Sequence, residues 1–248
     1  MTIGVAVIGA GMAGRGHAAA YRAATSLYGS DLPEVKLVSI GDVNAQFGEA
    51  AAKRFGFERH DADWRTIADD PNIHAVSVVV ANHLHREIVE GLLAAGKHVL
   101  CEKPLSDTLD DARAMVKAAA EAKSIARIGL TFLRNPAIAA IQQLIASGEL
   151  GKVLHFSGKY WADYSADPMN PIAWRYKGGM GTGALADVGS HISYVAEFIT
   201  GKPFSAVSGA RFVTAITERP VATGAVQGHG AAPVSDKFDT VENDDYAG

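Results

Sequence analysis

Cysteine is almost absent from this 248-residue chain: Cys101 is its single example, so no disulfide can form within it. A lone cysteine is typical of proteins in a reducing compartment, and we therefore expect a cytoplasmic protein. We interpret Cys101 itself as a small buried residue at the end of a strand rather than as a nucleophile.

Long apolar runs and clusters of one charge are also lacking. No stretch approaches the ~18 consecutive apolar residues that a membrane span requires, and nothing at the N-terminus has the pattern of a signal peptide. The net charge is −4 without a long basic run, which speaks against a nucleic-acid-binding surface. With 48% hydrophobic and 20% charged residues, the composition is that of a globular protein with a sizeable core.

Metal-ligating residues are not grouped either. His83 and His85 are close in sequence, but a metal site needs three or four ligands, and no cysteine or acidic partner stands at a matching spacing. We therefore expect no bound metal, with Asn82 lining a cofactor cleft and His85 at the start of a helix.

What is present begins with the first turn of the chain. An apolar run at residues 3–8 leads into Gly9-Ala10-Gly11-Met12-Ala13-Gly14, and a helical pattern follows over residues 13–24. Strand, glycine turn and helix in this order are the context of a dinucleotide-binding fingerprint. Gly9 permits the tight turn, Gly11 lets the backbone approach a pyrophosphate, and Gly14 lets helix and strand pack closely. A purely structural turn is the alternative.

An acidic residue completes this fingerprint. Residues 35–40 are typical of the next strand, and Asp42 follows its end, where a carboxylate can accept hydrogen bonds from ribose hydroxyls. The spacing exceeds the usual ~20 residues, which we attribute to a loop over residues 25–33. Asp42 favours NAD over NADP, because it would repel a 2′-phosphate and no arginine immediately follows it.

The first half of the chain alternates between strands and helices. We expect an α/β Rossmann domain over residues 1–130, built on a doubly wound parallel sheet of six strands. Five of these strands fall at residues 3–8, 35–40, 75–80, 98–101 and 125–130, and helices fall at residues 13–24, 44–55, 63–69, 85–95 and 107–122. Gly9, Asp42, Asn82 and Glu102 all follow strand ends, which places them on one rim of the sheet.

The regular alternation ends after residue 130. We expect a second, α+β domain over residues 131–248, with an antiparallel or mixed sheet. Its expected elements are helices at residues 136–146 and 184–200, strands at 152–161 and 204–216, a long loop at 164–183 and a Gly/Ala-rich loop at 223–234.

Two groups of residues in these domains have the composition of a catalytic site. Lys103, in Glu102-Lys103-Pro104, stands at a strand's carboxyl end and could place an ammonium on a substrate oxygen; a surface lysine in a turn is the alternative. Asp187 and His191 are four residues apart on a helix and share a face with Tyr194. A carboxylate beside an imidazole raises its basicity, and an ordinary structural ion pair is equally compatible with this spacing.

Aromatic and charged residues gather in the loop over residues 160–176. Flat rings with carboxylate and guanidinium groups suit a polyhydroxylated ring, although an interface loop has the same composition. The residues that we assign to substrate binding here are Trp161, Asp163, Trp174 and Arg175.

Taken together, these motifs resemble the Gfo/Idh/MocA (glucose–fructose oxidoreductase / inositol dehydrogenase) family. The Glu102-Lys103-Pro104 motif and the later Gly183-Ala-Leu-x-Asp187-x-Gly-x-His191 stretch are far more specific than the glycine turn. Arg134-x-Pro136 is similar to an R-x-P stretch of the family, and residues 81–85 to its cofactor-side P-N-x-x-H segment. The loop at residues 165–175 is similar to that of the subgroup containing levoglucosan dehydrogenases.

The resemblance implies NAD(P)-dependent hydride transfer from a secondary alcohol of a sugar, anhydrosugar or inositol. Lys103, Asp187 and His191 would then be the catalytic trio and would also contact the substrate. The sequence does not determine whether Lys103 or His191 transfers the proton. The implied cofactor contacts are Gly9, Gly11, Met12, Ala13, Gly14, Asp42, Asn82, His85, Glu102, Lys103 and Arg134.

Two other functions stay open: a non-catalytic dinucleotide-binding regulatory protein, and an NAD-assisted glycosidase or lyase. The resemblance also implies a homodimer or homotetramer formed through the second domain's sheet. Family members are longer, and only two strands of that sheet are recognisable here. We therefore expect the second domain to be incomplete at its C-terminus.

Overall fold

The computed structural model describes residues 2–27, 31–179, 181–226, 232–242 and 246–247. By its internal contacts the chain divides into two compact units, Met1–Gly129 and Leu130–Gly248. None of the helices among the described residues is both long enough and apolar enough to cross a membrane.

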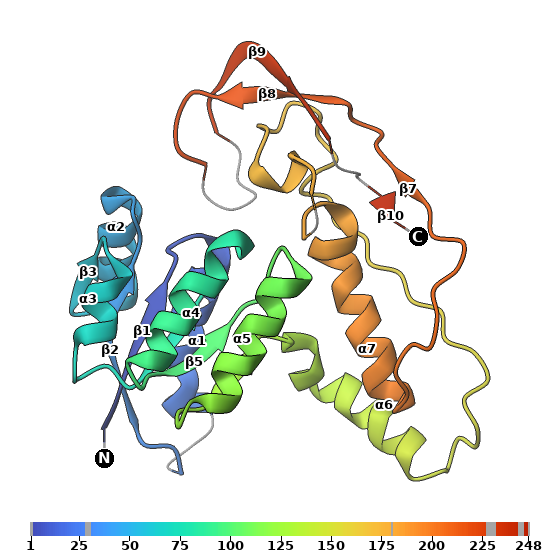
Figure 1. Cartoon of the computed structure of the whole chain (residues 1–248), viewed down its shortest axis with the longest axis horizontal. Helices are drawn as coiled ribbons and strands as arrows, with labels where there is room; N and C mark the ends of the chain where they lie inside the picture. Colours follow the sequence, from blue (N-terminus) through green and yellow to red (C-terminus); the bar gives the residue numbers. More distant parts are fainter. Residues whose placement is uncertain (1, 28–30, 180, 227–231, 243–245, 248) are drawn as a thin grey trace. The chain divides into compact units, whose positions relative to one another are not determined.

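The first unit is built on a single sheet of six parallel strands (Figure 1). Its strands are β1 (Thr2–Ile8), β2 (Glu34–Gly41), β3 (Arg59–Asp61), β4 (Ala75–Val78), β5 (His98–Cys101) and β6 (Ala126–Ile128). They lie in the order β3-β2-β1-β4-β5-β6, so the direction of winding reverses between β1 and β4. This confirms the predicted doubly wound sheet, in which ligands bind outside the carboxyl ends of the strands at such a reversal.

One strand of this sheet was not located from the sequence. Strand β3 consists of Arg59, His60 and Asp61, and pairs with β2 through Ser39, Ile40 and Gly41. An edge strand of three polar residues has no apolar run and too few residues to show an alternation, so hydrophobic periodicity gives no signal for it.

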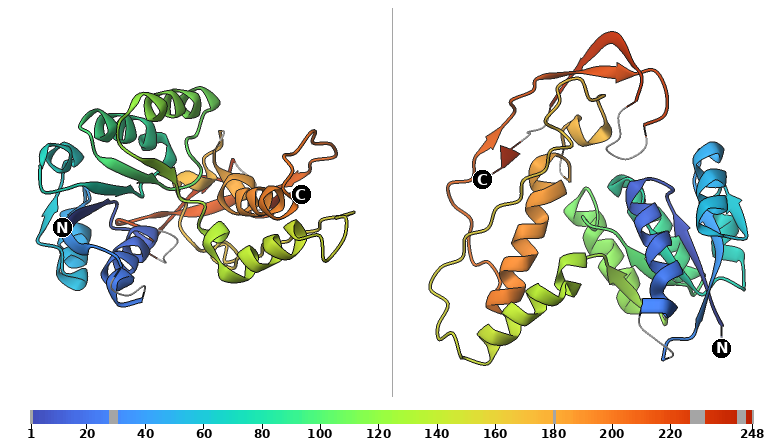
Figure 2. Two further views of the ribbon diagram at one scale, coloured as in Figure 1. Left: turned by 90° about the horizontal axis from the view of Figure 1, so that it is seen from below. Right: turned by 180° about the vertical axis from the view of Figure 1, so that it is seen from behind.

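Helices cover both faces of the sheet (Figure 2). They are α1 (Met12–Leu27), α2 (Ala45–Phe55), α3 (Trp64–Asp69), α4 (His85–Ala94) and α5 (Leu109–Glu121). Short polar side chains accept hydrogen bonds from the first turns of three of them: Asn44 for α2, Asp63 for α3 and Thr108 for α5. The five predicted helices are confirmed to within a few residues at their ends.

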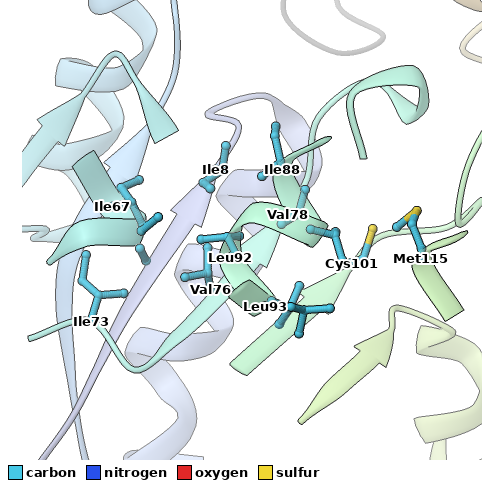
Figure 3. Close-up of a cluster of buried hydrophobic side chains, with 14 of the residues drawn as sticks. Ile8, Ile67, Ile73, Val76, Val78, Ile88, Leu92, Leu93, Cys101 and Met115 are labelled. Carbon is cyan, nitrogen blue, oxygen red and sulfur yellow. The ribbon is translucent and has the colours of Figure 1, made fainter. Parts of the chain in front are cut away.

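Apolar side chains from both element types form the core between these layers. Figure 3 shows one buried cluster, in which Val76 and Val78 of β4 lie with Leu92 and Leu93 of α4. Cys101 belongs to the same cluster and is only 2% exposed, which confirms its interpretation as a buried residue. Burial raises the pKa of its thiol to about 12, so it is un-ionised at neutral pH.

The second unit is less regular, but it is α+β as predicted. Its helices are η2 (Thr131–Arg134), α6 (Pro136–Ala146), η3 (Trp174–Tyr176), the π-helical turn η4 (Leu185–Gly189) and α7 (Ser190–Thr200). Two antiparallel strand pairs accompany them: β7 (Phe212–Val213) with β10 (Tyr246–Ala247), and β8 (Glu218–Ala222) with β9 (Val234–Thr240). The predicted helices at residues 136–146 and 184–200 are confirmed.

The strands predicted in this unit were wrong. Residues 152–161 form no strand, and within 204–216 only Phe212 and Val213 do. Alternation of apolar and polar residues sets the directions of side chains, but a strand exists only where a neighbour completes its hydrogen-bond ladder. The predicted loop at residues 223–234 lies between β8 and β9, apart from Val234, which begins β9; residues 227–231 lie outside the described part of the chain.

Candidate functional site

The glycine turn lies between β1 and α1, beside the reversal of the sheet. Gly9 has φ 108°, and a Cβ there would lie 2.1 Å from the carbonyl oxygen of Val79. A Cβ on Gly14 would lie 1.8 Å from the carbonyl oxygen of Gly9. The packing of the protein therefore excludes side chains at both positions.

Gly11 differs from its two neighbours in the motif. A Cβ built on Gly11 would have no heavy atom within 4 Å, so neither packing nor backbone conformation requires glycine there. The space beside Gly11 borders the N-terminus of α1, whose backbone N–H groups favour an anion. This open position fits the close approach of a pyrophosphate.

Asp42 connects the end of β2 to the glycine turn. One carboxylate oxygen accepts the N–H of Ala10 at 2.8 Å, and the other accepts the N–H of Asn44 at 2.8 Å. A carboxylate oxygen can accept more than one hydrogen bond, so both atoms keep capacity for ribose hydroxyls. The carboxylate that the sequence predicts for the ribose hydroxyls is thus held against the glycine turn through Ala10.

A half-buried chain of polar side chains joins α1 to the Glu102-Lys103-Pro104 loop. His17 Nε2 lies 3.0 Å from Glu102 Oε1, and His17 Nδ1 lies 3.1 Å from Ser77 Oγ. The Tyr21 hydroxyl lies 2.8 Å from the same Ser77 oxygen. Sequence reasoning missed this chain, although His17 and Tyr21 are four residues apart on one helix, a spacing that places them side by side.

Glu102 also accepts the backbone N–H of Lys103, at 3.1 Å. Burial by itself would raise the pKa of Glu102, but the bonds from His17 and Lys103 outweigh it, and the pKa lies below its usual value. Glu102 is therefore ionised at neutral pH. Its side chain holds the backbone of Lys103 directly after β5, where the sequence predicts a catalytic ammonium.

His85 supports the same loop from the other side. It is 1% exposed, its Nδ1 lies 3.1 Å from the carbonyl oxygen of Pro104, and its Nε2 lies 3.1 Å from that of Val80. Burial lowers the pKa of His85 despite these carbonyls, so the ring is neutral at pH 7. Its position at the start of α4 is confirmed, and its contacts with backbone groups hold the loop that carries Lys103.

In the second unit, Asp187 lies in the π-helical turn η4. The hydroxyl of Tyr164 donates to Asp187 Oδ2 at 2.6 Å, and Arg175 Nε lies 3.4 Å from the same oxygen. Burial and then the Asp187 charge raise the pKa of Tyr164, so its hydroxyl keeps its proton. Single π-helical turns recur at functional sites in helices, and this one presents Asp187 to Tyr164 and Arg175.

His191 follows in the first turn of α7 and is 9% exposed. Its ring stacks with Phe132 at a centroid distance of 4.5 Å and with Tyr160 at 5.7 Å. Its Nδ1 lies 2.5 Å from the Tyr194 hydroxyl. The sequence predicts that Asp187 sets the basicity of His191, and the structure adds Tyr194 as a partner of the imidazole.

A cavity of about 1280 Å³ lies within the second unit, and Asp187, Tyr164, Arg175, Tyr160 and Trp161 are among the residues that line it. Buried Arg219 of β8 holds the backbone near Ser165, which lines the cavity. Its guanidinium donates to the carbonyl oxygens of Ser165 and Asp167 at 2.6 and 2.8 Å. Sequence reasoning missed Arg219, since an arginine in a short hairpin carries no pattern of its own.

The other predicted site residues differ in how exposed their side chains are. Arg175 stacks over the ring of Trp174 at 4.5 Å, and Asn82 is buried at the start of η1 (Asn82–Leu84). Trp161 is 77% exposed. Met12, Ala13, Asp163 and Arg134 are also exposed. Among the described residues, no group of three or more His, Cys, Asp or Glu side chains is placed to hold a metal ion.

A parallel sheet with a glycine turn at its reversal, an acidic residue after the next strand and an open space at Gly11 defines a dinucleotide-binding α/β protein. Residues 3–130 match the family described as "Oxidoreductase family, NAD-binding Rossmann fold", and residues 138–247 match the GFO/IDH/MocA C-terminal domain. The chain therefore belongs to the GFO/IDH/MocA oxidoreductase family, as its motifs suggested.

Curated relatives are similar over most of this chain. It is 38% identical over 231 residues to levoglucosan dehydrogenase of Pseudarthrobacter phenanthrenivorans, covering 92% of this chain and 58% of that protein. It is 29% identical to scyllo-inositol 2-dehydrogenase (NAD(+)) of Bacillus subtilis, covering 73% of this chain and 51% of that one. The chain thus spans between half and three fifths of the length of these two relatives.

Solved structures show the same likeness. A levoglucosan dehydrogenase in complex with NADH and levoglucosan is 35% identical, with a TM-score of 0.88 over 100% of this chain and 62% of the other. An NAD-binding oxidoreductase from Klebsiella pneumoniae is 33% identical, with a TM-score of 0.84.

Proposed function

We propose that this protein is an NAD-dependent oxidoreductase that transfers a hydride from a secondary alcohol of a cyclic polyol to the nicotinamide. Residues 1–130 would bind the dinucleotide, and residues 131–248 would contribute to the substrate site. The observation that carries the proposal is the open backbone at Gly11, with Asp42 fixed beside it. That combination suits a pyrophosphate and an adjacent ribose better than a purely structural turn.

Bound NAD would supply the hydride acceptor. Side chains of this protein would bind the substrate hydroxyl and accept its proton. Lys103, held through its backbone by Glu102, would contact the substrate hydroxyl, as His191 would from the second unit. Asp187, held by Tyr164 and Arg175, would keep a negative charge near the imidazole.

A cyclic polyol is the substrate class that suits the second unit. Tyr164, Arg175 and Asp187 supply donors and an acceptor at one wall of its cavity, and Trp161 supplies a flat apolar surface. The names of relatives, levoglucosan dehydrogenase and scyllo-inositol 2-dehydrogenase, support the choice of an anhydrosugar, sugar or inositol. A homodimer or homotetramer in the cytoplasm, as expected from the sequence, is also part of this proposal.

A substrate screen tests the proposal. The purified full chain would be incubated with NAD and, separately, with levoglucosan, scyllo-inositol, myo-inositol and glucose, and the absorbance of reduced nicotinamide would be followed. We expect turnover with at least one of these compounds. Calorimetric titration with NAD would be run in parallel, so that binding and chemistry are measured separately.

Lys103→Ala is the matched variant for the screen. Loss of a positioned acid–base group costs about 10²- to 10⁴-fold in rate, while NAD affinity should change little. Unchanged turnover would remove Lys103 from the mechanism. Tight NAD binding by the unmodified chain, without hydride transfer from any compound, would instead favour a dinucleotide-binding regulatory protein.

A further inference from the structure

His60 lies in β3, the edge strand that was not located from the sequence, and its ring contacts the backbone of Asp42. His60 Nε2 lies 2.8 Å from the carbonyl oxygen of Asp42. A carbonyl oxygen can only accept a hydrogen bond, so Nε2 carries a proton and is the donor. The N–H of Asp42 donates to the carbonyl oxygen of Asp61, also in β3, at 3.1 Å. Both backbone polar groups of Asp42 are therefore bound by β3.

Gly48, within α2, leaves the space that this imidazole occupies. Glycine is among the least favourable residues inside a helix, and Gly48 has no positive φ that would require it. A Cβ on Gly48 would lie 2.0 Å from Cδ2 of His60 and 2.4 Å from its Nε2. The position of the imidazole therefore explains the glycine, and a larger residue would displace the ring from Asp42.

The carboxylate of Asp42 is bound as well as its backbone. Its two oxygens accept the N–H groups of Ala10 and Asn44, each at 2.8 Å. A carboxylate in this place accepts hydrogen bonds from the ribose hydroxyls of NAD and repels the 2′-phosphate of NADP. Its discrimination between the two nucleotides depends on the charge staying in one position, and that position is fixed by the backbone of Asp42.

We propose that His60, whose ring fits against Gly48, is a positioning residue that sets the preference for NAD over NADP through Asp42. This inference rests on the proposed function and deepens it. Without the imidazole bond, Asp42 can shift, so that its hydrogen bonds to the ribose of NAD weaken and its repulsion of a 2′-phosphate weakens too. Loss of the bond therefore lowers the affinity for NAD and not that for NADP, whereas a general loss of structure would lower both.

Calorimetric titration with NAD and with NADP tests the proposal without any turnover. The full chain and its variants would be titrated with each nucleotide, and the ratio of the two dissociation constants is the readout. His60→Phe keeps a flat ring but has no donor in the place of Nε2. We expect the preference for NAD to fall about 3- to 10-fold, the scale of one lost hydrogen bond. An unchanged preference, or an equal loss of affinity for both nucleotides, would overturn the proposal.

Two further variants separate the donor from the space that the ring occupies. His60→Gln offers an amide N–H near the place of Nε2 and should restore the preference to within twofold. A preference as low as that of His60→Phe would contradict the role of the donor. Gly48→Ala leaves His60 and Asp42 chemically intact but fills the space of the ring, so the preference should fall as in His60→Phe. Full preference for NAD in Gly48→Ala would contradict the proposal, and this variant decides if His60→Phe does not fold.

His74→Phe is the matched control. His74 Nδ1 accepts the backbone N–H of Gly4 at 2.9 Å, just before β4 and therefore at the amino ends of the strands. This variant also loses one bond between an imidazole and the backbone, but at the edge of the sheet opposite to Asp42, so the preference should not change. A fall as large as in His60→Phe would contradict a local effect on Asp42.

The two proposals fail in different ways. A preference of the unmodified chain for NADP would overturn this inference and leave hydride transfer untouched. Selective binding of NAD without turnover of any cyclic polyol would refute the proposed function, while the ratios in the variants would still decide the role of His60.

Discussion

The two units of this chain hold their candidate functional residues in different ways. In the first unit, Gly9, Asp42 and Lys103 follow the ends of parallel strands, and the sheet itself fixes where their backbones lie. In the second unit, Asp187 and His191 lie in a helical segment and contact side chains that include Tyr164 and Arg175 for Asp187 and Tyr194 for His191. A buried sheet therefore positions the candidate residues of the first unit, and individual side chains position those of the second.

The two units also differ in how many of their apolar residues are buried. Two clusters fill the faces of the sheet in the first unit. Among the described residues of the second unit, only Tyr176, Ala196 and Val241 are both hydrophobic and buried. Substitutions in the first unit should therefore affect folding or cofactor binding, while those in the second should affect the substrate site.

Gly14→Ala should have the largest effect. Its Cβ would lie 1.8 Å from the backbone oxygen of Gly9, so α1 and β1 would have to move apart. We expect a loss of about 3 kcal/mol or more in the free energy of unfolding, measured by urea denaturation. A variant as stable as the unmodified chain would show that the helix and strand pack less closely than described.

Arg219→Met should be next, and it tests the second unit. Arg219 is fully buried and holds the carbonyl oxygens of Ser165 and Asp167. Loss of charged hydrogen bonds of this kind costs about 1.5–3 kcal/mol each. We expect a higher KM for the alcohol with an unchanged NAD dissociation constant. A change in NAD binding as large as that in KM would contradict the separation of the two roles.

Gly11→Ala should leave folding intact. The added Cβ meets no protein atom within 4 Å, but it would occupy the space assigned to the pyrophosphate. We expect the NAD dissociation constant to rise about 10- to 100-fold, equivalent to about 1.4–2.7 kcal/mol, with the denaturation midpoint unchanged. Equal NAD affinity in this variant would place the pyrophosphate elsewhere.

Glu102→Gln should have the smallest effect, and the effect should depend on pH. The folded-state pKa of Glu102 lies below its ordinary value of 4.5, so ionised Glu102 stabilises the fold above that pH. This contribution is lost as the pH falls from 4.5 through the folded-state pKa. The variant should be about 1 kcal/mol less stable at pH 7, and the difference should shrink on acidification. A constant difference between pH 7 and pH 3 would contradict the role of the charge.

The same contrast explains how much the sequence could predict. Apolar runs at β1, β2, β4 and β5 predicted these strands of the first unit, because strands covered on both faces of a parallel sheet are near-continuous hydrophobic runs. The short polar strand β3 escaped that pattern. In the second unit, the alternation at residues 152–161 predicted a strand that does not form, since pairing depends on a neighbour and not on the segment's own pattern.

The candidate site divides in a similar way. The positions of Gly9, Asp42 and Lys103 relative to the strands followed from the sequence alone. Neither the contact between His17 and Glu102 nor the one between Tyr194 and His191 could be predicted from the sequence. His17 and Glu102 are far apart in the chain, so no local spacing brings them together. Tyr194 was placed on the same helix face as His191, but its bond to Nδ1 depends on ring orientations that spacing does not determine.

Transfer of deuterium tests the central claim most directly. A cyclic polyol that is a substrate in the screen would be labelled with deuterium at the reacting carbon and incubated with the full chain and NAD. We predict one deuterium in each reduced nicotinamide, and a slower reaction than with unlabelled substrate where the chemical step limits the rate. Reduced nicotinamide without deuterium, or a carbonyl product formed without reduction of NAD, would contradict hydride transfer between substrate and cofactor.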